Sequence, residues 1–308
     1  MADIYKSKAG QQAVERLYRG VLQRWPVPNR QVMVPTRHGE TFVIASGEPN
    51  ATPLVLFHGS GTNSSAWMGE IAAWAQHYRV YAVDVIGEPG LSAPSRPSLH
   101  STAYVEWLDD VWDRLGLESA GIVGVSLGGW LGLEYAVKRP ARVASLSLVS
   151  PSGVGAQNNL LLLKAGVLLM LGSWGRRKAL SLVTGPTNLR ADVSDALLLR
   201  FRHFRPRMEK LPIRTDEELA SLRMPVQLIV GGKDALLRSQ ETRDRMLRCV
   251  PHLQLTYLEN EGHILPRQTA TIAAFLEAAL LAARGGQSCD PDVARHRAAL
   301  VGDAIAVR

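Results

Sequence analysis

The sequence predicts an α/β protein whose core is a mostly parallel, doubly wound sheet with a helical region inserted into it. Over most of the chain, short apolar runs rich in β-branched residues alternate with helical patterns. These runs are continuously apolar, as in "TPLVLF" and "AGIVGV", which is typical of strands covered by helices on both faces. The alternation stops after residue 150, where leucine and arginine dominate, and it resumes near residue 220.

The first 150 residues hold the first part of this alternation. An amphipathic segment comes first, and a turn at His38 and Gly39 then separates the two strands of a hairpin. Ser101 or Thr102 is suited to cap a later helix. The expected elements are a helix at about 8–24, the hairpin over 30–48, strands at 52–59 and 78–87 with a helical pattern at 64–77 between them, a helix at 101–115, a strand at 120–125, a helix at 127–138 and a strand at 141–151.

The second half adds the inserted region and completes the sheet. Residues 151–219 contain helical patterns and no strand signal. The elements expected after them are a strand at 224–234, a helix at 239–249, a strand at 253–263 and a helix at about 268–284. We therefore divide the chain into an α/β core (1–150 and 220–284), a helical insertion (151–219) and a weakly patterned C-terminal tail (285–308).

The composition is that of an ordinary globular protein. With 308 residues and 46% hydrophobic content, the chain is long enough to bury a sizeable core. The formal net charge is +7, but the lysines and arginines are scattered, and we interpret the densest cluster, at 200–214, as a solvated face. No basic run is interleaved with aromatic residues in a nucleic-acid-binding motif. We expect no nucleic-acid partner.

The cysteine count and the N-terminal segment bear on cofactors and location. Cys249 and Cys289 form neither a disulfide framework nor a metal-ligand spacing, which favours a reducing compartment. We expect no metal and no cofactor. The N-terminal segment has no apolar core followed by a cleavage site, so it does not resemble a signal peptide. The prediction is a cytoplasmic protein.

The most apolar stretch is "LLLLKAGVLLMLG", residues 160–172. It is too short to span a bilayer and carries Lys164 near its middle. We expect it to be the buried face of a helix, or an apolar wall for an acyl or alkyl group.

The stretch "AGIVGVSLGGWLG", residues 120–132, surrounds a single serine, Ser126, with glycines. An interior helical glycine costs about 1 kcal/mol relative to alanine, so these glycines meet a local geometric demand. The serine stands where a buried strand ends and a helix begins. In such a sharp turn, side chains at Gly124 and Gly128 would collide, and the serine hydroxyl is held away from the strand. The pattern predicts an exposed nucleophile.

Two later strands end in groups that activate a serine. A serine needs a base, and the base needs a third group to orient it. In a parallel α/β sheet such groups lie at the carboxyl ends of strands. Asp234 follows the strand "PVQLIV" and His263 follows "LQLTYL". We expect Asp84 to order the loop after its own strand, and His58 to form hydrogen bonds within its loop.

These motifs together resemble the α/β-hydrolase fold family over about residues 30–284, with the order Ser, Asp, His. The resemblance implies that Ser126 is the nucleophile, Asp234 the acid and His263 the base. "FHGSGTNSSAW" is similar to the family's oxyanion loop, which implies that the backbone amides of Ser60 and Leu127 bind the oxyanion.

Two further segments bear on the kind of family member. "DVIGEPGLSAPSRP" resembles the family's Asp-x-x-Gly segment, with an extra residue between Gly87 and Gly90 that is associated with bacterial carboxylesterase-like members. Residues 151–219 match in position the helical cap that many members carry over the active site.

The function implied by this resemblance is hydrolysis of carboxylic esters through an acyl-enzyme, on small to medium, largely apolar substrates. Thioester, lactone and carbon–carbon bond hydrolysis and biosynthetic cyclisation are alternatives on the same residues. A binding protein that uses the pocket as a receptor is a second class. The sequence leaves open the natural substrate, its chain length and the oligomeric state, for which a homodimer is one candidate.

Overall fold

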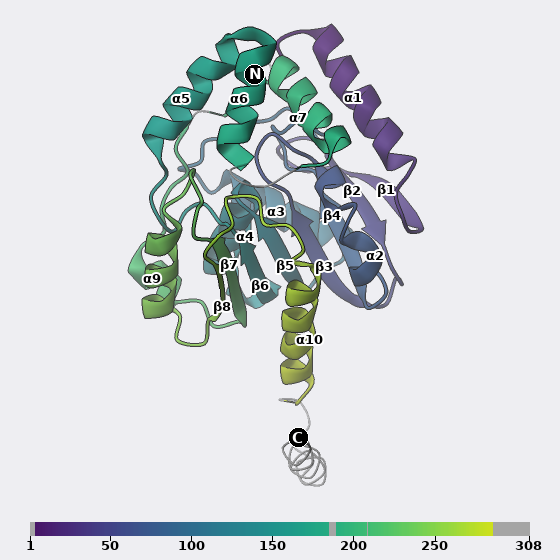
Figure 1. Cartoon of the computed structure of the whole chain (residues 1–308). Helices are drawn as coiled ribbons and strands as arrows, with labels where there is room; N and C mark the ends of the chain where they lie inside the picture. The colour runs from purple at the N-terminus through teal and green to yellow at the C-terminus, as the bar shows by residue number, and fades with distance from the viewer. Residues whose placement is uncertain (1–3, 185–188, 208, 286–308) are drawn as a thin grey trace, which may run out of the picture.

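The core of the protein is a sheet, with helices on both of its faces and at one end (Figure 1). The computed structural model describes residues 4–184, 189–207 and 209–285. Within this part of the chain, eight strands form one sheet in the order β1-β2-β4-β3-β5-β6-β7-β8. The strands are β1 (Asn29–Val34), β2 (Thr41–Ser46), β3 (Thr52–Phe57), β4 (Tyr78–Val83), β5 (Ala120–Val125), β6 (Val143–Val149), β7 (Val226–Gly231) and β8 (Gln254–Leu258).

Most of the sheet is parallel, which confirms the predicted fold class. The hairpin strands β1 and β2 pair antiparallel, and β2 pairs antiparallel with β4. From β4 through β3, β5, β6 and β7 to β8, every neighbouring pair is parallel. The carboxyl ends of these strands therefore meet at one edge, where loops bring together residues far apart in the sequence.

The helices described are α1 (Lys8–Leu22), η1 (Ser64–Trp67), α2 (Ile71–Trp74), α3 (Ala103–Leu115), α4 (Leu127–Lys138), η2 (Pro140–Arg142), α5 (Asn159–Met170), α6 (Gly172–Thr184), α7 (Ala191–His203), α8 (Asp216–Ala220), α9 (Ser239–Cys249) and α10 (Thr269–Gly285). Side chains of α3, α4, α8 and α9 join one buried cluster, and side chains of α1, α2 and α10 join another. Ile122 and Val123, adjacent on β5, belong to different clusters because successive strand residues face opposite sides of the sheet.

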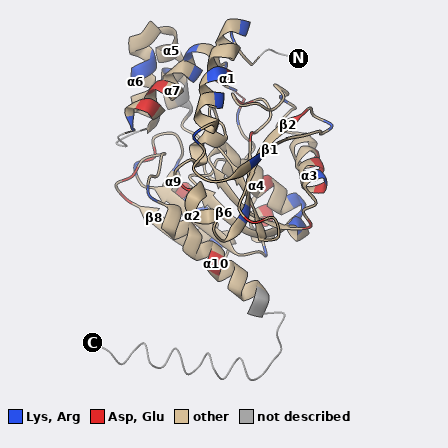
Figure 2. Cartoon of the chain, turned by 90° about the vertical axis from the view of Figure 1, so that its right-hand side faces the viewer, with Lys and Arg blue, Asp and Glu red and all other residues tan. Residues whose placement is uncertain are grey.

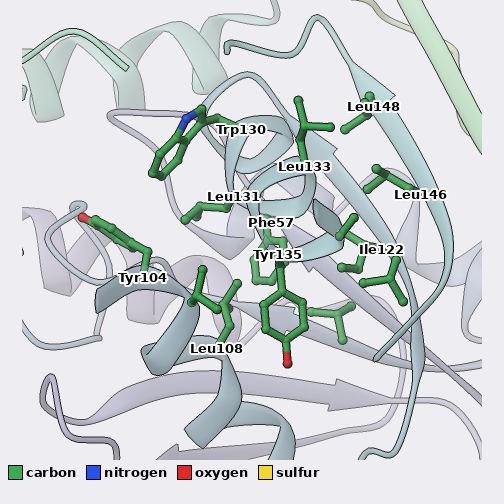
Figure 3. Packing of buried hydrophobic residues seen from close by; sticks show 14 of the residues in the cluster. Phe57, Tyr104, Leu108, Ile122, Trp130, Leu131, Leu133, Tyr135, Leu146 and Leu148 are labelled. Carbon is green, nitrogen blue, oxygen red and sulfur yellow. The ribbon is translucent and has the colours of Figure 1, made fainter. Parts of the chain in front are cut away.

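Figure 3 shows part of the first cluster, where side chains of α4 pack with those of α3 and of the sheet. Trp130 meets Tyr104 edge to face, with ring centroids 5.8 Å apart, and Tyr135 is fully buried. Trp107, also fully buried, keeps its indole N–H satisfied by donating to Thr41 Oγ1 at 2.7 Å. Burial of each such side chain contributes about 1.5–3 kcal/mol to stability, and this packing fixes α4 against the sheet.

The helices of the inserted region, α5, α6 and α7, lie at one end of the sheet (Figure 1). The chain enters this region from β6, and Asn158 N–H donates to Leu236 O at 2.8 Å, next to the loop after β7. The N-terminal segment is joined to the far side of the region, since Lys6 N–H donates to His203 O and Arg205 N–H donates to Ile4 O, both at 2.8 Å. These contacts attach the helices to the core at two places.

The apolar stretch 160–172 departs from the expectation of a buried face. Leu161 is buried, but Leu163 is 65% exposed and Met170 is 85% exposed. Apart from Lys164, the stretch is apolar around its circumference, whereas α5 packs chiefly against one neighbour, α6. One neighbour covers only one side of a helix, so the opposite apolar side remains at the surface.

One smaller expectation needs correction. The helical pattern at 64–77 is interrupted, and η1 and α2 replace one continuous helix, with Gly69 between them. Thr102, one of the two residues expected to cap the next helix, is the N-terminal cap residue of α3; its hydroxyl donates to Glu106 Oε1 at 2.6 Å and accepts no hydrogen bond from the helix backbone. Except for Gly285, the predicted tail lies outside the described residues. Among the described residues, no helix is both long and apolar enough to cross a membrane.

Candidate active site

Ser126 lies at the junction of β5 and α4, in a backbone conformation that is rare for residues with a side chain. Its φ is 54° and its ψ is −108°. A side chain at Gly124 would overlap the carbonyl of Gly128, and one at Gly128 would overlap the carbonyl of Phe57 on β3. Strain of this kind persists only where the surroundings enforce it, and it is concentrated at functional sites. The glycines therefore let a sharp strand-to-helix turn fit against the neighbouring strand.

Three side chains from separate loops form a hydrogen-bonded line. His263 Nε2 lies 3.1 Å from Ser126 Oγ, and His263 Nδ1 lies 2.8 Å from Asp234 Oδ2. Because a carboxylate only accepts, the imidazole donates through Nδ1, which leaves Nε2 to accept the serine proton. The side chains of His263 and Asp234 are 9% and 0% exposed, so water competes little for these bonds.

The backbone beyond β7 holds the carboxylate of Asp234 in place. Its Oδ1 accepts from the amides of Leu236 at 2.8 Å and Leu237 at 3.0 Å. Ser239 Oγ lies 3.4 Å from Oδ2, the oxygen that faces His263. Hydrogen bonds from amides to a carboxylate are charge-assisted and directional. The orientation of Asp234, and through it that of His263, is thus fixed by its own loop.

Backbone amides flank the serine on two sides. Leu127 begins α4, where the first amides have no acceptor within the helix and the helix dipole favours negative charge. The loop after β3 approaches from the other side, since a Cβ added to Gly59 would lie 3.6 Å from Ser126 Cβ. Ser60 follows directly. The two amides expected from the sequence to bind an oxyanion, those of Ser60 and Leu127, therefore both belong to backbone close to Ser126.

Asp84 and His58 form hydrogen bonds within their own loops, as expected from the sequence, and they also connect the loop after β3 to the loop after β4. Asp84 Oδ1 accepts from Tyr18 Oη at 2.9 Å and from the amide and hydroxyl of Ser64 at 2.9 and 2.7 Å. His58 Nε2 accepts from the amide of Val85 at 3.0 Å. Burial lowers the pKa of His58, which favours its neutral form. Both side chains stabilise the loops and do not contact Ser126.

Glu88 is a feature that the sequence analysis missed. Its side chain is buried beside the loop after β3, and its Oε2 accepts from the amide of Gly61 at 2.5 Å. Burial raises the pKa of Glu88 to about 7. The available signal was the extra residue between Gly87 and Gly90, which lengthens the loop where Glu88 stands.

No group of three or more His, Cys, Asp or Glu side chains within the described ranges is arranged to hold a metal ion. His203 and His252, which have no motif around them, lie away from the hydrogen-bonded line; His252 contacts the carbonyl of Met224.

Residues 54–278 match the family model described as the alpha/beta hydrolase family. The chain belongs to the alpha/beta hydrolase family. The match runs from β3 to α10 and includes Ser126, Asp234 and His263.

Among the relatives of this alpha/beta hydrolase are two proteins of Bacillus subtilis (strain 168). The uncharacterized carboxylesterase Nap is 32% identical over 265 residues, which cover 82% of this chain and 87% of that protein. The carboxylesterase YbfK is 32% identical over 259 residues, which cover 80% and 86%. The crystal structure of naproxen esterase (carboxylesterase NP) from Bacillus subtilis has a TM-score of 0.78 at 30% identity, covering 89% of this chain and 98% of that one.

Proposed function

We propose that this protein is a serine hydrolase that cleaves carboxylic esters. The observation that carries the proposal is the line from Ser126 Oγ through the imidazole of His263 to the carboxylate of Asp234. The substantial similarity to carboxylesterases over most of the chain supports esters as the substrate class.

In the proposed mechanism, Ser126 Oγ attacks the ester carbonyl carbon while His263 Nε2 takes its proton. Asp234 keeps the imidazole in the required tautomer and stabilises the imidazolium that forms. His263 then returns the proton to the leaving alkoxide, which departs as an alcohol and leaves an acyl group on Ser126. Water, deprotonated by the same histidine, attacks the acyl carbon. The bond from that carbon to Ser126 Oγ then breaks, His263 returns the proton to Ser126 Oγ, and the acid is released.

The tetrahedral intermediate in each half of the reaction carries a negative oxygen. We assign its stabilisation to the backbone amides of Ser60 and Leu127, which supply positive dipoles from two sides of Ser126. Removing one such donor typically lowers the rate by about 10²- to 10³-fold. The position of Leu127 at the start of α4 adds the dipole of the helix to its amide.

The remaining expectations complete the proposal. We assign residues 151–219 to a cap over the active site and 1–150 with 220–284 to the hydrolase core, with small to medium, largely apolar esters as substrates. We also propose a cytoplasmic protein that acts on small molecules and not on nucleic acid. A homodimer stays a separate prediction, which light scattering of the purified protein tests directly.

The first test is covalent labelling combined with turnover. A fluorophosphonate probe should label Ser126 stoichiometrically, as located by mass spectrometry of the labelled peptide, and p-nitrophenyl esters from acetate to decanoate should be hydrolysed. Ser126→Ala should lose labelling and at least about 10³-fold in kcat while keeping its circular dichroism spectrum. Ser101→Ala, a surface serine outside the site, is the matched control and should match the unsubstituted protein.

Wild-type turnover in Ser126→Ala would contradict the proposal. Labelling of Ser126 without ester turnover would instead favour the thioester, lactone, carbon–carbon or cyclase alternatives. No labelling at all would favour a receptor-like binding protein.

A further inference from the structure

The carboxyl group of Glu88 contacts the loop that carries the Ser60 amide. Oε2 of Glu88 accepts from the buried amide of Gly61 at 2.5 Å, and Ser60 Oγ lies 3.4 Å from the same oxygen. Gly59, at the start of this loop, lies against Ser126. One buried side chain is therefore bonded to the backbone immediately after the proposed oxyanion donor.

Other hydrogen bonds between the two loops act on either side of residues 59–61. Before them, His58 Nε2 accepts from the amide of Val85 at 3.0 Å. Asn63 Nδ2 donates to Pro89 O at 2.9 Å, and Ser64 donates to Asp84. Within residues 59–62, the backbone N–H and the hydroxyl of Thr62 both donate to Gly59 O. These bonds close the turn but do not anchor it to the loop after β4. Among the described residues, Glu88 is the side chain that joins the loop after β4 to residues 60 and 61 by hydrogen bonds.

Burying the carboxyl group of Glu88 against the amide of Gly61 carries an electrostatic cost. Burial raises the pKa of Glu88 to about 7, although the amide of Gly61 and the guanidinium groups of Arg96 and Arg207 act in the opposite direction. A carboxyl group is seldom buried unless something compensates for its desolvation. Here the carboxyl group supplies an acceptor to the buried amide of Gly61. This compensates in part for the desolvation of Glu88, because a buried amide without an acceptor costs about 1–3 kcal/mol.

We propose that Glu88 is a positioning residue that sets the backbone of residues 59–61 so that the Ser60 amide points at the oxyanion formed at Ser126. The extra residue between Gly87 and Gly90 lengthens the loop in which Glu88 stands. This inference rests on the proposed function, because it presupposes that the Ser60 amide stabilises the oxyanion.

The test compares Glu88→Ala with Glu88→Gln. The alanine variant leaves Gly61 without its acceptor, and kcat for p-nitrophenyl butyrate should fall about 10- to 100-fold with KM changed less than about threefold, because the loss affects the transition state more than substrate binding. The glutamine variant keeps a carbonyl oxygen for the amide of Gly61, so it should restore kcat to within about threefold of the unsubstituted protein.

Glu70→Ala is the matched control. Glu70 is a half-buried glutamate whose pKa is also raised by burial, and it stands between η1 and α2, away from residues 59–61 in the sequence, so its loss should leave kcat within about twofold. An equal loss in Glu88→Ala and Glu88→Gln, or a rise in KM without a fall in kcat, would overturn the inference. So would an unchanged kcat in Glu88→Ala.

Labelling separates failure of this inference from failure of the proposed function. Stoichiometric fluorophosphonate labelling of Ser126 in the unsubstituted protein, together with an unchanged kcat in Glu88→Ala, would reject the role of Glu88 and leave the serine esterase standing. Absence of labelling and of ester turnover in the unsubstituted protein would reject the proposed function itself, and with it the role of Glu88.

Discussion

Asp234 and Glu88 both have buried side chains in the loops around Ser126, but they differ in the number and kind of their hydrogen-bond partners. Asp234 accepts from two backbone amides and faces an imidazole N–H. Glu88 accepts from one amide and, at longer range, one hydroxyl. Burial disfavours the ionised form of Glu88, and its hydrogen bonds offset the lost hydration only in part. The pKa of Glu88 is therefore raised mainly by burial.

The raised pKa of Glu88 predicts a contribution to stability that depends on pH. Its pKa is about 7 in the folded protein against an ordinary value of 4.5, so the folded state holds this proton more tightly than the unfolded state. Its contribution to stability is present below pH 4.5 and is lost as pH rises toward 7. A shift of this size corresponds to about 3 kcal/mol.

Glutamine does not ionise, so Glu88→Gln should remove the loss of stability that Glu88 causes as pH rises. Urea unfolding at pH 5 and pH 8.5 should show that the free energy of unfolding of the variant, relative to the unsubstituted protein, is higher at pH 8.5 by about 2–3 kcal/mol than at pH 5. The same relative stability at both pH values would show that Glu88 is not desolvated as described.

At the scale of elements, the sequence predicts where a segment begins and ends better than it predicts which side of the segment is buried. The strand β5 and the helices α4 and α9 coincide with the segments expected at 120–125, 127–138 and 239–249. These segments have clear boundaries because a turn with glycine or a proline interrupts the pattern. Apart from Lys164, the helix α5 is apolar on all sides, so its pattern gives little information about which side faces the core.

The orientation of α5 predicts unequal effects at two leucines of the same helix. Leu161 is 9% exposed and Leu163 is 65% exposed. Leu161→Ala should lower the free energy of unfolding by about 2 kcal/mol or more, and Leu163→Ala should change it by less than about 0.5 kcal/mol. Thermal and urea unfolding of the two variants provide the measurement. The reverse order of effects would show that α5 is rotated about its axis.

At the scale of the whole molecule, the net charge of +7 is spread over a surface of mixed sign. Many arginines are paired with acids, as in Arg139 with Asp109 and Arg37 with Asp110. Figure 2 shows residues of both signs on α3 and α7. A nucleic-acid surface requires uncompensated cations that release counterions on binding.

The mixed surface predicts weak and nonspecific affinity for polyanions. On heparin, the protein should elute near the start of a salt gradient, at or below physiological ionic strength. Retention into high salt, with binding to DNA that falls steeply as salt rises, would contradict the expectation that nucleic acid is not a partner.

The sequence by itself determined the α/β class, the order of most elements and the candidate residues Ser126, Asp234 and His263. This was achievable because apolar periodicity is local, and because parallel strands bring their carboxyl ends to one edge whatever the details of packing. The glycines around Ser126 also mark a geometric requirement that is local to the turn.

Only the tertiary structure decided which oxygen of Asp234 faces His263, that Glu88 binds the amide of Gly61, and which side of α5 is exposed. Each of these depends on contacts between segments distant in sequence. Glu88 and Gly61, for example, are 27 residues apart and lie on different loops. Burial, which sets the pKa of Glu88, is a property of all the surrounding chain and leaves no local pattern in the sequence.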